Sequence, residues 1–215
     1  MPKITIDFRF LEIEEDLWII SEYIAMLENG LPTLVEGERR RIWDEVSKEE
    51  DEVQHSIGYH LEQRLDTGLT TRFLTASAIT ASWAMYEAGV TSIARYIRDK
   101  RGAALTLNDL RGDFLDRARR YFTDVLQFPL HAPTTDWDVL RKITGIRHAF
   151  AHANGRVSDL NQDLRSKVES WCKTDPNLRL EDECLIADTA FGKQALALVQ
   201  GLIKDLIART KASFK

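Results

Sequence analysis

The segment from Thr70 to Arg101 constrains the fold of this chain most strongly, because its pattern is typical of one long helix. Its apolar side chains recur at steps of three and four, which places them on a common helix face: Ala76, Ile79, Trp83, Tyr86, Val90, Ile93 and Ile97. Small residues between them let a neighbouring helix approach closely, and Gly102 marks the end. The segment therefore predicts a central core helix within a helical bundle.

Weaker periodic patterns predict the rest of the fold. Asn29-Gly30 followed by Pro32 is a typical helix stop, so we expect separate helices before and after it. The helices are expected at 12–29, 38–66, 107–128, 135–154, 159–173 and 189–211. The stretch LRLEDECLIAD is typical of a small hairpin turning about Glu181-Asp182. We thus expect an all-α bundle of about five or six helices with a small β-hairpin near 178–187.

The length of the chain fits one domain. A globular chain of 215 residues buries roughly 70% of its unfolded surface, so a single core suffices without a disulfide or metal. We expect one domain over 1–215, in which residues 1–68 form a helical extension packed on a bundle at 69–212. The two cysteines, Cys172 and Cys184, match no zinc or redox spacing and are expected to be free thiols in a reducing compartment.

Composition also narrows the class of protein. No segment has the apolar length of a membrane span, and the N-terminus lacks the apolar core of a secretion signal, so we expect a cytoplasmic protein. The net charge of −5 argues against broad, charge-driven binding to nucleic acid. However, residues 111–156 contain eight Lys and Arg against five Asp and Glu. This local basic excess coincides with the chain's most informative motif.

The motif is RHAFAHANG, from Arg147 to Gly155, at the end of the helix expected at 135–154. His148 and His152 are four residues apart and share a helix face. Arg147 and His152 are five apart, which places them about 140° apart around an ideal helix. Three arrangements remain open: the helix end unwinds, the two side chains approach one ligand from different angles, or the helix meets a copy of itself across a two-fold axis.

The residue types suit cleavage of RNA without a metal. An imidazole accepts and donates protons near neutral pH, so His152 can take the proton of a ribose 2′-hydroxyl. The guanidinium of Arg147 stays charged and grips phosphate oxygens through parallel hydrogen bonds, which stabilises the charge that develops during the reaction.

These residues resemble the Arg-x4-6-His motif of HEPN domains, and the resemblance extends from about Thr70 to Lys211. It implies a bundle of four to five helices, a homodimer and, in many members, a metal-independent endoribonuclease that needs no cofactor and acts on single-stranded RNA. Such members are frequently the toxin of a toxin–antitoxin pair, so a defence role and an antitoxin protein are further expectations. By this resemblance Arg147 and His152 are catalytic, at a site where two copies of the motif meet.

Three residues are expected to support that site. His148 stands where the family most often has Asn, and Asn154 follows the motif at the helix end. The resemblance implies that Glu87, on the core helix, contacts the region of Arg147. The sequence alone favours a salt bridge of Glu87 with Arg95 or Arg98 equally.

Two alternatives stay open. The family also contains non-catalytic members, so the chain can instead be a dimeric binding module that uses the same surface. The roughly 65 additional N-terminal residues are able to cover or reshape that surface.

The second alternative is a zinc site. His148 and His152 have the spacing of a zinc-binding pair, but no third ligand lies nearby in sequence, and no metal is expected. The chain has no nucleophile elbow and no glycine-rich phosphate loop.

Overall fold

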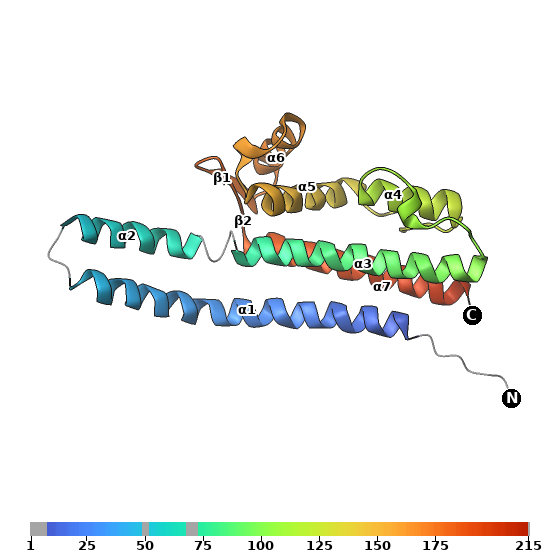
Figure 1. Cartoon of the computed structure of the whole chain (residues 1–215), viewed down its shortest axis with the longest axis horizontal. Coiled ribbons are helices and arrows are strands. Elements are labelled where there is room, and N and C mark those ends of the chain that lie inside the picture. Colours follow the sequence, from blue (N-terminus) through green and yellow to red (C-terminus); the bar gives the residue numbers. More distant parts are fainter. Residues whose placement is uncertain (1–7, 49–51, 68–72, 215) are drawn as a thin grey trace.

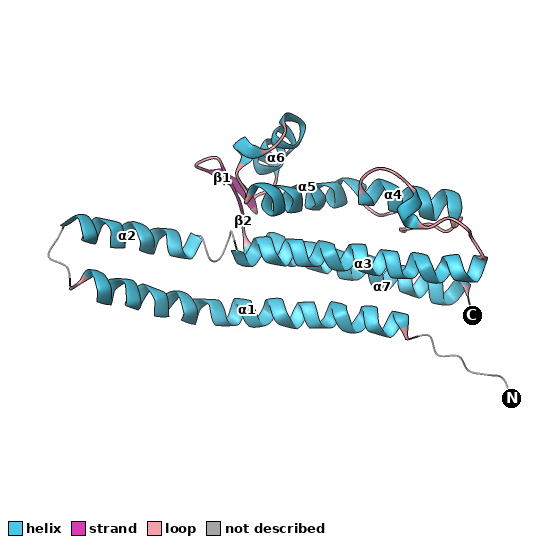
Figure 2. Cartoon of the chain, in the orientation of Figure 1, coloured by secondary structure: helices cyan, strands magenta, loops and turns pink. Residues whose placement is uncertain are grey.

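A computed structural model describes residues 8–48, 52–67 and 73–214. Helices α3 and α7 lie side by side at the centre, with α1 along one side and α5 along the opposite side (Figure 1). The described residues form seven α-helices and one two-stranded antiparallel sheet, which confirms the predicted all-α bundle with a hairpin (Figure 2). The elements are α1 (Arg9–Val46), α2 (Glu52–Thr67), α3 (Ala76–Arg101), α4 (Phe114–Arg120), α5 (Trp137–Ala153), α6 (Gln162–Thr174), β1 (Leu178–Glu181), β2 (Cys184–Ala187) and α7 (Thr189–Ser213).

Helix α3 is the predicted core helix. All of the apolar side chains that predicted it are buried, and Gly102 ends it in the left-handed conformation, at φ 65°. Gly89 lets α7 approach α3, because a Cβ at this position would lie 3.0 Å from Cδ1 of Ile203. The core therefore forms where α3 and α7 pack, and the other helices cover this pair.

The predicted helix stop at Asn29-Gly30 is wrong. Helix α1 continues through this pair and through Pro32 to Val46. Proline removes one helical hydrogen bond, but packing before and after it outweighs this local cost, since Ile24 and Val35 are both buried. The chain leaves the helical path only after Val46, between α1 and α2. Helix α1 therefore contains the first expected helix, 12–29, and the start of the second, 38–66, and α2 contains the rest of the second.

The helix expected at 107–128 is also divided differently. A short 3-10 turn at Leu107–Asp109 is followed by Gly112 with φ 116°, and α4 begins only at Phe114. Asp113 caps α4 by accepting a hydrogen bond from the backbone N–H of Asp116. A residue in the conformation of Gly112 cannot continue a helix, which explains the interruption.

The hairpin forms near 178–187 as predicted, but its turn lies one residue later than the Glu181-Asp182 turn that we expected. Glu181 pairs with Cys184, and the turn residues Asp182 and Glu183 both have positive φ.

Helix α1 packs on α3 and α7, and α2 packs on the C-terminal half of α1 (Figure 1). The boundary expected between residues 68 and 69 lies outside the described residues. None of the described helices combines the length and the apolar composition needed to cross a membrane.

Candidate functional site

Helix α5 carries all three charged or titratable motif residues. It begins after Asp136, whose carboxylate accepts hydrogen bonds from the N–H groups of Asp138 and Val139, and it remains helical through Ala153. The helix therefore does not unwind between Arg147 and His152, and the first of the three open arrangements is excluded. The two side chains lie on different sides of one intact helix, about 140° apart.

Arg147 lies half-buried at the edge of the face of α5 that packs on the core. Its Nε atom is buried and has no hydrogen-bond partner among the described residues. A buried polar atom of a cation costs free energy until it is hydrogen-bonded. The guanidinium thus provides an unsatisfied donor on the motif helix.

His148 and His152 are exposed and adjacent. Their ring centroids are 4.4 Å apart, with an interplanar angle of 45°. Loss of hydration lowers the pKa of His148 first, and the charges of His152 and Arg147 lower it further. The lowered pKa favours the neutral imidazole of His148, which suits a hydrogen-bond partner better than a fixed cation.

The two histidines line different hollows. His148 lies in a groove of about 740 Å³ between α4, α5 and α6, whose charged lining residues are Asp113, Asp116, Asp138, Arg141 and Lys167. His152 lines a hollow of about 550 Å³ at the end of α5, with Asn154, Arg156 and Asp159. Because carboxylates outnumber Lys and Arg in the groove, it does not favour a polyanion.

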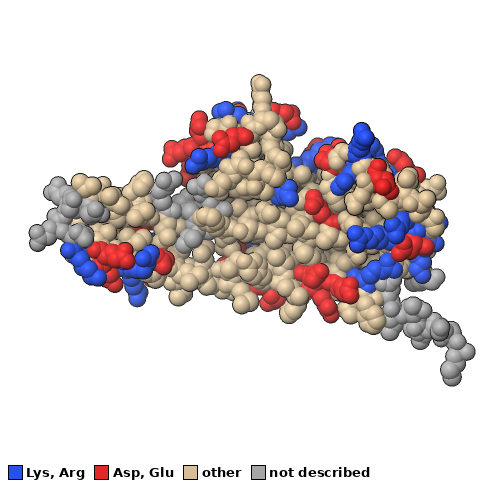
Figure 3. All heavy atoms as spheres, viewed as in Figure 1, with Lys and Arg blue, Asp and Glu red and all other residues tan. Residues whose placement is uncertain are grey.

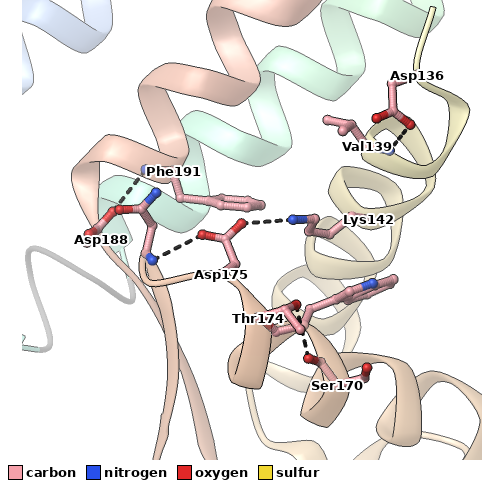
Figure 4. Close-up of polar contacts among 10 residues, drawn as sticks. Asp136, Val139, Lys142, Ser170, Thr174, Asp175, Asp188 and Phe191 are labelled. Atoms are coloured by element: carbon pink, nitrogen blue, oxygen red, sulfur yellow. Dashed lines mark hydrogen bonds and ion pairs between the residues drawn. The ribbon is translucent and has the colours of Figure 1, made fainter.

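Helix α6 is fixed to α5 beside this groove. Lys142 donates to the carboxylate of Asp175 at 2.8 Å, and the backbone N–H of Asn177 donates to the same carboxylate (Figure 4). Burial opposes ionisation of Asp175, but these two hydrogen bonds and the charge of Lys142 hold its pKa below the usual value. A Cβ on Gly145 would lie 2.5 Å from Cη2 of Trp171, so only glycine lets this ring pack against α5.

The end of α5 is attached to the hairpin. Asn154 and Gly155 adopt positive φ angles of 48° and 78°. The carbonyl of Gly155 accepts the N–H of Leu185 at 2.7 Å, and the N–H of Val157 donates to the carbonyl of Glu183 at 2.9 Å. The Asn-Gly pair signalled a turn in the sequence, but no local signal indicated that the hairpin would bind this turn. The expected supporting residue Asn154 thus shapes the helix end.

Glu87 does not meet either expectation stated for it. Its carboxylate accepts a hydrogen bond from Nε1 of Trp83 at 2.7 Å, one turn earlier in the same helix. Arg98 pairs with Asp99 instead, and no ion pair joins Glu87 to Arg95 or Arg147 within the described chain. Glu87 therefore accepts the hydrogen bond of a core indole, and the i, i+4 spacing within one helix brings the two side chains together.

The sequence also gave no indication of a buried pair formed by Tyr86 and His131. The tyrosine oxygen lies 2.6 Å from Nε2 of His131, and both residues are buried. Burial lowers the pKa of His131 to about 4, with a smaller lowering contribution from Arg209.

No group of three His, Cys, Asp or Glu side chains is arranged to hold a metal ion anywhere in the described ranges. The zinc alternative for His148 and His152 therefore lacks a third ligand among these residues.

Comparison of the chain with protein-family models, with curated proteins and with solved structures gives no match. The chemistry of the site is therefore inferred from its own residues and their geometry.

Proposed function

We propose that this protein is a metal-independent endoribonuclease of the HEPN type, of the kind that serves as a toxin or defence nuclease. The observation that carries the proposal is the half-buried guanidinium of Arg147 on the same intact helix as the exposed His152. A phosphodiester would accept parallel hydrogen bonds from this guanidinium. His152 would take the proton of the 2′-hydroxyl and return a proton to the leaving oxygen.

The 140° separation supports a site built from two chains. On one copy of α5 the two side chains diverge, whereas two copies related by a two-fold axis would bring Arg147 of one beside His152 of the other. The face between them carries the half-buried Thr144 and the exposed His148 and Ala151, and two of these side chains are small enough for a close helix approach. We therefore propose a homodimer through α5, with single-stranded RNA as the substrate.

The test is cleavage of varied single-stranded RNAs in the presence of EDTA. The wild-type protein is expected to release fragments with 2′,3′-cyclic phosphate ends, because the 2′-oxygen attacks the phosphate. Arg147→Ala and His152→Ala should each lower the rate by on the order of 100-fold or more. His60→Ala and Arg165→Ala are matched controls, since both side chains are exposed on other helices.

Two results decide against the nuclease. Equal inactivity of the wild type and both motif variants over varied RNAs would contradict it. Equal activity of all three proteins would show that another site, or a contaminant, cleaves the RNA. A partner protein, such as an antitoxin, whose binding survives His152→Ala would then favour the non-catalytic binding module.

A further inference from the structure

Helix α1 has a second apolar face that nothing in the described chain covers. Its core side is formed by Ile13, Leu17 and Ile24, which are buried against α3 and α7. At about 100° per residue, the opposite side carries a row of large exposed apolar side chains together with the exposed carboxylates of Glu15 and Glu22. The apolar side chains are Leu11, Trp18, Ile19, Tyr23, Met26 and Leu34, preceded by Phe8 just before the helix. We call these seven residues the outer face of α1.

The outer face is too large to be a set of scattered surface residues. Trp18 is 63% exposed and Met26 is 71% exposed. With roughly 100 Å² exposed for each of seven large side chains, the face offers on the order of 700 Å², above the patch size usual for a monomer. In Figure 3 the edge of the molecule formed by α1 is mostly tan through its middle, with charged atoms toward both ends.

We propose that the outer face of α1 packs along helix α1 of a second copy of this chain in an antiparallel, two-fold arrangement. Two such faces would bury about 1,400 Å² in total, which lies within the usual range for a stable interface of about 1,200–2,000 Å². Tryptophan and tyrosine at the centre of the face are the residue types that dominate binding free energies.

Side-chain size fits this arrangement. With the two-fold axis between Met26 and Leu27, Tyr23 of one copy faces Gly30 of the other, and Ile19 faces Leu34. A Cβ at Gly30 would meet nothing within 4 Å in the single chain, so its surface is open to the larger side chain. Large side chains opposite small ones allow two helices to pack closely.

The charge pattern selects the antiparallel orientation. Four acidic residues lie near the start of α1, at positions 12, 14, 15 and 16, whereas the arginines at 39–41 form ion pairs with glutamates of the same chain. A parallel pair would place the four acidic residues against their own copies, which is unfavourable. An antiparallel pair avoids this and places Glu12 opposite Arg41.

This interface is separate from the one proposed for α5. Helices α1 and α5 lie on opposite sides of the α3 and α7 pair (Figure 1). A dimer through α1 therefore leaves Arg147, His148 and His152 uncovered. The two proposals can fail independently, and a protein that uses both interfaces forms an assembly larger than a dimer.

The first test is molar mass in solution, measured by light scattering and analytical ultracentrifugation at 1–100 µM (concentrations typical for such weak to moderate affinities). The wild type is expected to have at least twice the 24.7 kDa mass of one chain. Tyr23→Glu and Met26→Arg should each weaken α1-mediated association by about 100-fold, because they place charge in an apolar interface. Leu105→Glu is the matched control, since Leu105 is as exposed as Tyr23 and lies in the loop after α3, outside the outer face of α1.

The second test reverses charges. Glu12→Arg and Arg41→Glu should each weaken association by roughly 3- to 10-fold, and the double variant should restore it. Circular dichroism must show unchanged helix content in each variant. A monomeric wild type, unaltered association of Tyr23→Glu and Met26→Arg, or a double variant without restoration would each overturn the proposal. Association lost in His152 or Arg147 variants, but kept in the α1 variants, would support only the α5 dimer.

Discussion

Helices α1 and α3 are both long and rich in apolar residues, but they use those residues differently. Helix α3 packs against α1, α5 and α7, and none of its large apolar side chains is exposed. Helix α1 packs on the bundle along one side, and none of the other described segments covers its outer face. The comparison shows that apolar content alone does not define a core helix, because the number of neighbours around the helix decides which side chains are buried.

Two tryptophans test this comparison most strongly. Trp83→Ala in α3 should lower the free energy of unfolding by about 3–5 kcal/mol, because a fully buried ring is removed and Glu87 loses its donor. Trp18→Ala in α1 should cost less than about 1 kcal/mol in the dissociated chain, since its ring is mostly exposed. Urea unfolding at low protein concentration measures both. Equal losses would contradict the distinction between the two helices.

The pH dependence of stability tests the surroundings of α3 through His131, which contacts Tyr86. Its pKa is lowered to about 4 in the folded protein, so the unfolded chain binds the extra proton first as the pH falls. The stability that His131 contributes is complete above its unfolded pKa, near 6.5, and is lost toward pH 4, by about 3 kcal/mol.

The variant His131→Phe has no imidazole to titrate, and phenylalanine keeps a ring of similar volume. Urea unfolding at pH 7 and pH 4 should therefore show a smaller loss in the variant than in the wild type, by about 3 kcal/mol. Other titrating groups contribute equally to both proteins. The same loss in both would show that His131 is accessible to protons in the folded state.

Two glycines provide the smallest and most direct contrast. Gly89→Ala in α3 should destabilise the protein by about 1–2 kcal/mol, because the new methyl group would press on Ile203. Gly37→Ala in α1 meets nothing within 4 Å and should stabilise the helix by about 0.5–1 kcal/mol. Thermal unfolding midpoints should thus move in opposite directions. A shift of the same sign in both would mean that α1 is as tightly surrounded as α3.

The sequence predicted those elements whose signals are local. The stripe of α3 and the hairpin near 178–187 both depend on residues within a few positions of one another, and both are confirmed. The continuation of α1 through Pro32 was missed because it depends on packing against distant helices, whereas the Asn-Gly-x-Pro signal is local.

The candidate site was predictable to the same extent. Helical spacing placed His148 beside His152 and separated His152 from Arg147, as the structure has them. Arg141, Thr144 and His148 are three and four residues apart, so the sequence alone places them on one face of α5. This face forms one wall of the groove between α4, α5 and α6. The opposite wall comes from α4 and α6, and the missing partner of the Arg147 Nε depends on the whole fold, so neither was accessible to local patterns.

The attachment of the motif helix to the hairpin has a practical consequence. Two backbone amides form this attachment: that of Leu185 donates to the carbonyl of Gly155, and that of Val157 donates to the carbonyl of Glu183. Their hydrogens exchange with solvent only when the attachment opens. They lie next to the motif without belonging to it. Their exchange rates therefore report how firmly the end of α5 is held, and a ligand or second chain that immobilises this end should slow both rates together.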